Sequence, residues 1–491
     1  MANKQNSFVK SFAIIGGSTF LNMIIGVLTT PIITRLVRPE SYGQLSMFVL
    51  YTNMAVAVLC LGLDQALVRY YYESDGTGYR SALLKKCVSW PCVISLVVSV
   101  VVCVLAYYDV ISFFSISVIV LLCVNIVLHL IYRFGLLVVR LEKNSKLYGL
   151  LQILYKLLYV VLAIVFLILT DIDDFVLLAL ATVAAVAICL VSCIWAQKTH
   201  WFKVRNFGGK IVSQTELIKY GYPYVFSMGI ATLFQAADKM ALNMYCSYSV
   251  VGVYASAMSL VNIFAIVQTT FNTLWGPIAM EHYAKNPKDT SLYVQANRII
   301  TVVMFVLGTS LILCKDLFAV LLGEEYREAA FVLPFLIFNP IMYTISETTC
   351  LGLVFKKKSK MQVVVVLIPC VVNIIGNTVL VPHLGGVGAA ISTGISYIIF
   401  YIMRTLISTY YYPVDYNMKP FLLVTMIVSV YALYNTMHRI DMVSVIGYVF
   451  CILAIMFLYR DTVKWCFAYV LGFWEDFRKK GYAKLHKDKH D

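Results

Sequence analysis

Residues 147–196 read LYGLLQILYKLLYVVLAIVFLILTDIDDFVLLALATVAAVAICLVSCIWA. Two long apolar runs flank the short acidic segment Asp171–Asp174. About 20 apolar residues are enough for a helix to cross the hydrocarbon core of a bilayer. The stretch therefore predicts a helical hairpin that crosses a membrane twice.

The composition extends this prediction to the whole chain. Of 491 residues, 61% are hydrophobic and only 13% are charged, and the mean hydropathy is +0.82. Soluble domains carry roughly 25% charged residues. The composition excludes a soluble enzyme, a secreted disulfide scaffold and, despite a pI near 9.1, a nucleic-acid-binding protein. Basic loops that face anionic lipid account for the charge.

Apolar windows predict an all-α polytopic membrane protein with about 14 transmembrane helices. We expect two pseudo-symmetric six-helix lobes around a central cavity, followed by a C-terminal hairpin. The predicted spans lie near residues 8–34, 42–66, 87–107, 112–139, 147–169, 174–196, 217–244, 250–280, 296–318, 329–354, 360–381, 386–409, 418–437 and 442–459. The predicted divisions are an N-lobe (1–199), a cytoplasmic linker (200–216), a C-lobe (217–410), the last two spans (411–460) and a basic amphipathic tail (461–491).

The distribution of positive charge predicts the orientation, because cytoplasmic loops carry an excess of Lys and Arg. With the N-terminus inside, the predicted inner segments hold most of the 39 basic residues, including Lys356–Lys358, Arg404 and the tail. The outer loop Asp171–Asp174 has none. We therefore expect both termini to be cytoplasmic, in a multi-pass membrane protein.

A weak internal repeat accompanies the two predicted lobes. Gly43 opens the helix after the first outer loop, and Gly252 opens the corresponding helix of the second half. An asparagine follows ten positions after each glycine, at Asn53 and Asn262. Repeats of this kind fit transporters built from two halves around a central site.

Polar residues four positions apart share one helix face, and several predicted spans carry such stripes. Ionisable residues inside a membrane are costly and are functional candidates by default. Several polar helix faces need a water-filled cavity to point into, and cations in that cavity suit a phosphate or diphosphate. The candidate cavity cations are Arg133, Lys156 and Lys239. The candidate polar and aromatic lining residues are Asn22, Asn125, Gln152, Tyr155, Gln235 and Asn272.

Three further residues are candidates for coupling to an ion gradient, namely His129, Asp238 and Glu347. Each also has a structural interpretation. Asp238 can neutralise Lys239, His129 can be a hydrogen-bonded packing residue, and Glu347 can hold helices together. Arg133 and Lys156 lie close enough to the inner surface to extend toward it.

Motifs for the common catalytic and cofactor chemistries are absent from the sequence. It has no G-x-x-x-x-G-K-[ST] loop, no G-x-S-x-G elbow and no H-E-x-x-H helix. No Cys/His cluster has zinc-ligand spacing. We expect a transporter rather than an enzyme, without a cofactor or metal beyond a coupling ion, Na⁺ or H⁺.

Five segments in order resemble the bacterial polysaccharide-unit flippases of the multidrug/oligosaccharidyl-lipid/polysaccharide exporter superfamily. They begin at Arg35 (R-L-x-x-P-x-x-Y-G), Arg140 (R-L-E-K-N), Leu217 (L-I-K-Y-G-Y-P), Asp238 (D-K, then V-G-V-Y from Val251) and Pro382 (P-x-x-G-G-V-G-A-A). The resemblance spans residues 8–409. Lys239 stands where the family more often has arginine.

The resemblance implies a protein of the bacterial inner membrane with a V-shaped pair of lobes and alternating access. It also implies transport of undecaprenyl-diphosphate-linked oligosaccharides from the inner to the outer leaflet, for O-antigen, capsule or similar surface polysaccharides. A polysaccharide polymerase and glycosyltransferases are then expected partners. A cation-coupled multidrug exporter and a lipid II flippase stay open as alternatives.

Overall fold

The computed structural model describes residues 24–74, 76–110, 113–202 and 211–465, together with Gly17, Leu21 and Asn22. All regular elements in this part of the chain are helices. Nine of the described helices are long and apolar enough to cross a membrane, or ten if the bent pair Tyr248–Val261 and Ile266–Lys285 forms one span. This confirms the all-α polytopic fold. The number of 14 spans stays a prediction.

The chain divides into two compact units. The first unit comprises residues 1–266, 319–329 and 366–392. Its main helices are α2 (Pro39–Leu59), α3 (Leu63–Tyr70), α4 (Thr77–Tyr107), α5 (Ile116–Leu141), α6 (Ser145–Leu169), α7 (Asp174–Ala196), α8 (Lys198–Trp201), α9 (Gln214–Tyr245) and α10 (Tyr248–Val261).

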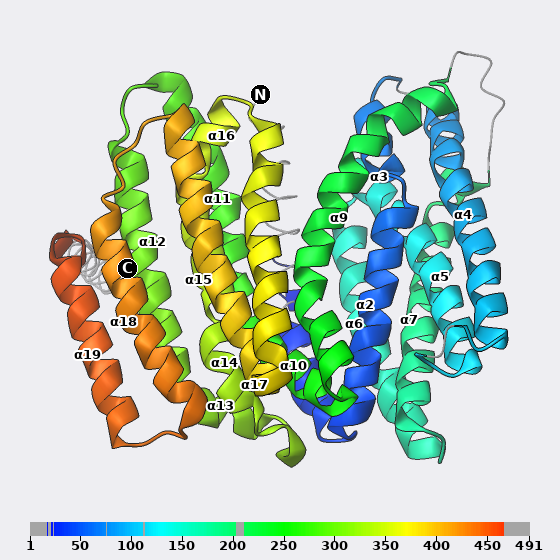
Figure 1. The fold of residues 1–491 in the computed structure, drawn as a ribbon. Coiled ribbons are helices and arrows are strands. Elements are labelled where there is room, and N and C mark those ends of the chain that lie inside the picture. Colours follow the sequence, from blue (N-terminus) through cyan, green and yellow to red (C-terminus); the bar gives the residue numbers. More distant parts are fainter. Residues whose placement is uncertain are drawn as a thin grey trace, which may run out of the picture. The chain divides into compact units, whose positions relative to one another are not determined.

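Helix α7 lies at the centre of the packing in the first unit. Its sequence is apolar on every side, and 56% of its most apolar stretch is buried against other helices. It packs against α2, α5 and α6 (Figure 1). A helix that is hydrophobic all round is expected in such a buried position. Two of the helices that pack against α7, α2 and α6, carry residues of the site.

Helices α2 and α10 cross at the two glycines of the internal repeat. A Cβ atom on Gly43 would lie 1.8 Å from the carbonyl oxygen of Tyr248, and one on Gly252 would lie 2.0 Å from that of Pro39. Small residues allow membrane helices to approach backbone to backbone. The repeat therefore marks a close helix crossing within one unit.

Two breaks redirect the chain. Leu61 and Gly62 have φ angles of +52° and +67°, and they separate α2 from α3. Helix α17 (Ser359–Tyr411) is interrupted at Gly385, where φ is +52°. This kink corresponds to the predicted outer turn between the spans near 360–381 and 386–409.

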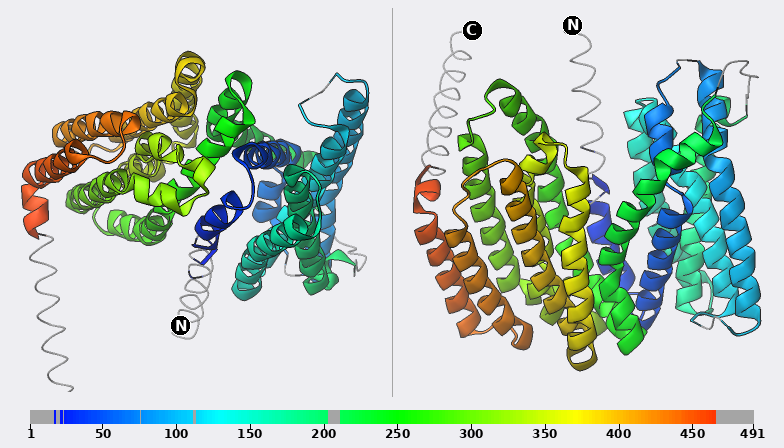
Figure 2. Two further views of the ribbon diagram at one scale, coloured as in Figure 1. Left: turned by 90° about the horizontal axis from the view of Figure 1, so that it is seen from below. Right: turned by 45° about the horizontal axis from the view of Figure 1, so that its top comes forward.

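The second unit comprises residues 267–318, 330–365 and 393–491. Within it, α12 packs against α15 and α19, and α18 runs beside α19 as the predicted C-terminal hairpin (Figures 1 and 2). Its helices are α11 (Phe264–Lys285), α12 (Ser291–Leu313), α14 (Ala329–Leu336), α15 (Phe338–Thr349), α16 (Leu351–Phe355), α18 (Met418–Met437) and α19 (Met442–Leu458). The short helices α13 (Lys315–Leu321) and η1 (Glu324–Tyr326) connect α12 to α14.

The lobe boundaries predicted at 199 and 217 remain predictions. Helices α9 and α10, which open the predicted C-lobe, belong to the same compact unit as α2. Most of the predicted basic tail, residues 466–491, lies outside the described residues, as do residues 203–210 of the predicted linker.

Candidate functional site

A cavity of about 430 Å³ lies inside the first unit. The apolar helix Ile24–Thr34 and helices α2, α6, α7, α9 and α10 contribute to its walls. Two of its described lining residues, Lys156 and Lys239, carry a positive charge, and none carries a negative one. Its other polar lining residues are Thr29, Tyr42, Ser46, Tyr155, Tyr159, Thr182, Ser259 and Asn262.

Lys156 enters the cavity from the middle of α6. Its Nζ donates a hydrogen bond of 2.8 Å to the backbone carbonyl oxygen of Asn22. A Cβ on Gly26 would lie 2.4 Å from this Nζ. The ammonium group therefore occupies space that is open only because residue 26 is glycine. Two of the ammonium hydrogens remain for other acceptors, because an ammonium group has three donors.

Lys239 and its neighbour Asp238 have separate surroundings on α9. Lys239 lines the cavity, whereas Asp238 is 5% exposed and faces α10 and α17. The Asp238 carboxylate accepts hydrogen bonds from Tyr254 Oη (2.6 Å), Asn373 Nδ2 (3.0 Å) and Asn377 Nδ2 (2.9 Å). The Asp238 carboxylate thus accepts three hydrogen bonds from neutral groups, besides its electrostatic interaction with the adjacent Lys239.

Hydroxyl groups of the cavity residues Ser259 and Tyr42 approach the buried Thr30 of the helix Ile24–Thr34. Thr30 Oγ1 and Ser259 Oγ lie 2.5 Å apart, and Thr30 Oγ1 lies 3.4 Å from Tyr42 Oη. Asn262 is exposed at the C-terminal end of α10. The cavity therefore offers two cations among uncharged donors, an arrangement that suits an anion with several oxygen atoms.

Arg133 lies in a second pocket, of about 390 Å³, rather than in the lysine cavity. Its Nη2 and Nε donate to Asp64 Oδ2 at 2.6 and 3.2 Å. His129 lines the same pocket, and its ring packs edge-on against that of Tyr155 at 5.7 Å. The three predicted cations are thus divided between two neighbouring pockets of one unit.

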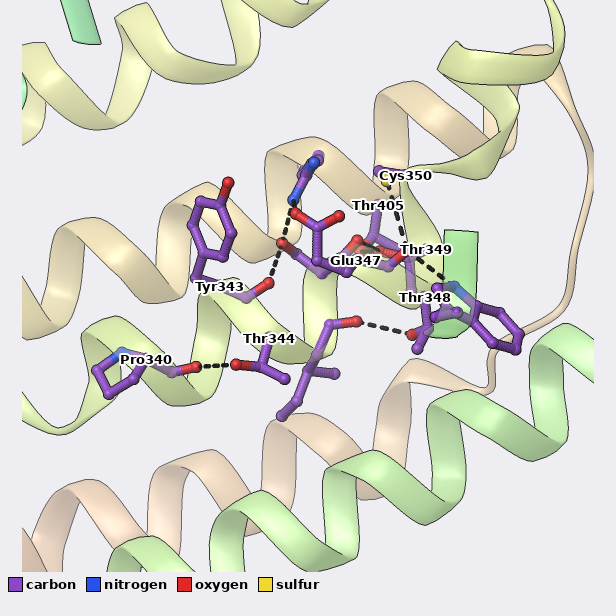
Figure 3. A network of polar contacts seen from close by, with 12 residues as sticks. Pro340, Tyr343, Thr344, Glu347, Thr348, Thr349, Cys350 and Thr405 are labelled. Atoms are coloured by element: carbon purple, nitrogen blue, oxygen red, sulfur yellow. Dashed lines mark hydrogen bonds and ion pairs between the residues drawn. The ribbon is translucent and has the colours of Figure 1, made fainter. Parts of the chain in front are cut away.

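Glu347 lies in the second unit, where Arg404 neutralises it. Glu347 Oε1 is 2.8 Å from Arg404 Nη1, and the two side chains are only 19% and 15% exposed. Arg404 Nη1 also donates to Ser346 Oγ at 2.6 Å. The Arg404 guanidinium lies over the Tyr343 ring. Figure 3 shows Glu347 within this network, with Tyr343 one turn earlier on α15 and Thr405 on the facing helix. Glu347 therefore holds α15 to α17.

The remaining predicted residues are dispersed. Asn125 is buried and donates to Thr52 Oγ1 at 3.0 Å, a packing contact between α5 and α2. Gln152 is half-buried on α6 and Gln235 is exposed on α9. Asn272 belongs to α11 in the second unit. Of the predicted polar residues, Tyr155 lines the cavity, and Asn22 supplies its carbonyl oxygen to Lys156.

Four charged or polar residues of these networks were not among the predicted site residues: Asp64, Asn373, Asn377 and Arg404. Asn373 and Asn377 are four positions apart, and this spacing in an apolar run is the signal that could have found them. Arg404 is counted among the charges of the predicted inner segments, near the end of the predicted span 386–409, and it lies within α17. Asp64 falls at the end of a predicted span, where a charge is unremarkable.

Comparisons with known proteins agree with this fold. The family model described as "Polysaccharide biosynthesis protein" matches residues 8–281. No curated protein sequence matches the chain. The solved structure of a lipid II flippase, MurJ, in an inward closed conformation is 14% identical, with a TM-score of 0.68 over 93% of this chain and 99% of that chain.

A multidrug resistance MATE family transporter of the MOP superfamily, in its inward-facing conformation, is also similar in structure. It is 15% identical, with a TM-score of 0.56 over 79% of this chain and 94% of that chain. These likenesses establish a flippase- and exporter-type transporter fold. Since the family model covers more than half of the sequence, the chain belongs to the polysaccharide biosynthesis protein family.

Proposed function

We propose that the protein is a flippase for undecaprenyl-diphosphate-linked oligosaccharide units, which it moves across the bacterial inner membrane for O-antigen, capsule or another surface polysaccharide. The observation that carries this proposal is the cavity lined by Lys156 and Lys239. Within the described part of the chain, neither lysine forms an ion pair. Two ammonium groups without a carboxylate in ion-pair contact, in a cavity whose described lining has no acidic residue, attract a diphosphate and disfavour a cationic drug.

The chemistry of the ligand predicts which residues contact each of its parts. The diphosphate would bind at the two ammonium groups, which act as point charges. Hydroxyl groups such as those of Tyr155, Tyr159 and Ser259 would contact the sugars, and the lipid chain would stay in the bilayer. Alternating access of the cavity would then move the head group from one leaflet to the other.

Asp238 is the coupling residue that the surroundings favour over Glu347 and His129. Asn377 is 1% exposed, and its Oδ1 lies buried without a hydrogen-bond partner next to the Asp238 carboxylate, which its Nδ2 contacts. Carboxylate and amide oxygens are ligands for hard cations, so an Na⁺ ion or a proton would complete this cluster. Glu347, by contrast, is already neutralised by Arg404.

The test of the cavity is complementation of a strain that lacks the gene. We expect Lys156→Gln and Lys239→Gln each to lower surface polysaccharide about 10- to 100-fold at unchanged protein level, since a hydrogen bond to a charged group contributes about 1.5–3 kcal/mol. Lys156→Arg and Lys239→Arg keep the charge and should retain most activity. Lys219→Gln, an exposed lysine on the same helix α9, is the matched control.

Three results would redirect the proposal. Normal polysaccharide display in both glutamine variants would exclude the cavity lysines as diphosphate ligands. Normal display in the deletion strain, together with sensitivity to cationic drugs, would favour the multidrug exporter. Loss of cell-wall precursor transport instead of surface polysaccharide would favour a lipid II flippase. For the coupling residue, Asp238→Asn should abolish the dependence of transport on the ion gradient, while Glu347→Gln should not.

A further inference from the structure

The pocket that contains Arg133 has the features of a separate binding site. It has a volume of about 390 Å³ and lies in the first unit. The Arg133 side chain is 38% exposed, and Arg140, two turns further along α5, lines the same pocket and is exposed. The other lining residues are Asn53, Val56, Asp64, Gln65, His129, Tyr132, Leu136, Leu137 and Tyr148.

The ion pair between Arg133 and Asp64 leaves much of the guanidinium group unused. Both of its contacts converge on a single oxygen, Asp64 Oδ2, and the other oxygen, Oδ1, accepts from the backbone N–H of Gln65 at 2.9 Å. A guanidinium group has five N–H donors, and a bidentate pair would engage both carboxylate oxygens. Arg133 therefore keeps donors for a second ligand.

Asp64 is carried by a short helix that is separate from the membrane-spanning helix α2. Helix α3 is eight residues long and follows the left-handed pair Leu61 and Gly62. A Cβ on Gly62 would lie 2.1 Å from the carbonyl oxygen of Gly221 on α9. Asp64 therefore lies beside a close contact between α3 and the N-terminal part of α9, the helix that carries Lys239.

Aromatic rings connect this pocket to the lysine cavity. His129 and Tyr132 line the Arg133 pocket, and Tyr155 lines the cavity. The Tyr155 ring lies 5.7 Å from the His129 ring and 6.4 Å from the Tyr132 ring. The two pockets therefore adjoin one aromatic cluster, and a ligand bound at Arg133 is a neighbour of one bound at Lys156.

We propose that the Arg133 pocket is a second phosphoryl-binding site, in which Asp64 occupies the place of the anion until a phosphoryl group displaces it. A lone guanidinium group is costly at membrane depth, and an internal carboxylate removes that cost while the site has no ligand. On displacement, Arg133 and Arg140 present two positive charges. The site deepens the proposed function, on which it rests for the diphosphate ligand, but an anionic phospholipid carries the same phosphoryl chemistry.

The test measures binding of inorganic pyrophosphate to the purified full-length protein in nanodiscs of neutral phosphatidylcholine. Asp64→Asn removes the competing charge at unchanged shape, and we expect it to tighten binding about tenfold, equivalent to about 1.4 kcal/mol. Arg133→Gln should weaken binding at least tenfold, and the double variant should behave like Arg133→Gln. Asp109→Asn, an exposed loop position, controls for the change in net charge.

A purely structural ion pair gives a different pattern. Asp64→Asn would then lower stability without tightening pyrophosphate binding, and the double variant would recover stability because both charges are gone. That pattern would overturn the proposal. Unchanged pyrophosphate affinity in Arg133→Gln would overturn it as well.

Two further arms separate the sources of the ligand and the two proposals. If farnesyl diphosphate competes with pyrophosphate, and pyrophosphate binding is unchanged when the nanodisc contains 30% phosphatidylglycerol, the ligand of the site is a lipid-linked diphosphate. If phosphatidylglycerol in the nanodisc weakens pyrophosphate binding, the ligand is a phospholipid. The same titrations in a Lys156→Gln/Lys239→Gln background isolate the Arg133 pocket. A tenfold effect of Asp64→Asn in that background supports the pocket even if the lysines prove dispensable for polysaccharide display.

Discussion

Gly43→Ala is expected to destabilise the protein strongly, because the added methyl group enters the crossing of α2 and α10. The Cβ atom would lie 1.8 Å from the carbonyl oxygen of Tyr248 and 2.9 Å from the backbone nitrogen of Gly252. Ordinary van der Waals contact begins at 3.4 Å, so the two backbones must separate by about 1.6 Å. Neither obstacle is a flexible side chain that could turn away.

The magnitude follows from two opposing effects. Overpacking by one methyl group costs typically about 1–3 kcal/mol, and a clash with backbone on both sides places this site at the upper end. Alanine recovers up to about 1 kcal/mol relative to glycine in a helix. We therefore expect a net loss of about 2 kcal/mol, which changes the unfolding equilibrium roughly 30-fold.

The assay is reversible unfolding of the purified protein in mixed micelles by titration with sodium dodecyl sulfate. Gly229→Ala is the matched control, because nothing lies within 4 Å of a Cβ at Gly229 on α9, and it should be neutral or slightly stabilising. Gly252→Ala should reproduce the loss, since its Cβ would lie 2.0 Å from the carbonyl oxygen of Pro39. Equal stability of Gly43→Ala and Gly229→Ala would refute the close crossing.

The same titration tests two other features. Glu347→Gln should cost about 3 kcal/mol by leaving Arg404 without its counter-ion, and the additional change Arg404→Gln should restore most of that loss; a double variant no better than the single would contradict the pairing. Hydrogen bonds from Tyr434 Oη and from Ser444 lower the pKa of Asp441, which caps α19, to about 2. Because the folded-state pKa is depressed, this cap stabilises the protein above about pH 4 and is lost as the pH falls toward 2. The wild type should therefore lose more stability than Asp441→Asn between pH 5 and 2.

The membrane-spanning helices are the part of the fold that the sequence predicts best. The stretch 147–169 and 174–196 corresponds to α6 (Ser145–Leu169) and α7 (Asp174–Ala196) within two residues. The reason is physical: a bilayer imposes one length on each apolar run, and charged residues mark its ends. Local backbone conformation is not encoded in hydropathy, so the break at Leu61 and Gly62 lies unseen inside the predicted span 42–66.

The sequence predicts those site residues that are unusual within their own helix, but not the partners that other helices bring to them. Lys156 and Lys239 stand out because an ammonium group is costly in a membrane wherever it points, and both line the cavity. Arg133 stands out for the same reason, but its partner Asp64 lies 69 positions earlier, and only the tertiary structure pairs them. The assignment of each cation to one pocket or the other depends on helix packing, which one sequence does not reveal.

The way in which each buried acid is compensated bears on the choice between an anion and a cation as the substrate. Asp64 and Glu347 each hold an arginine, and Asp238 accepts hydrogen bonds from a tyrosine and two asparagines. These three carboxylates are therefore engaged by the protein itself, whereas the lysines of the cavity face the space that a ligand would fill. An exporter of cationic drugs needs the opposite arrangement, with acids facing the cavity and cations held in pairs. The charge pattern thus favours an anionic head group at the cavity. Asp238 accepts its hydrogen bonds inside the first unit from neutral groups, so it is the carboxylate best placed to respond to a cation.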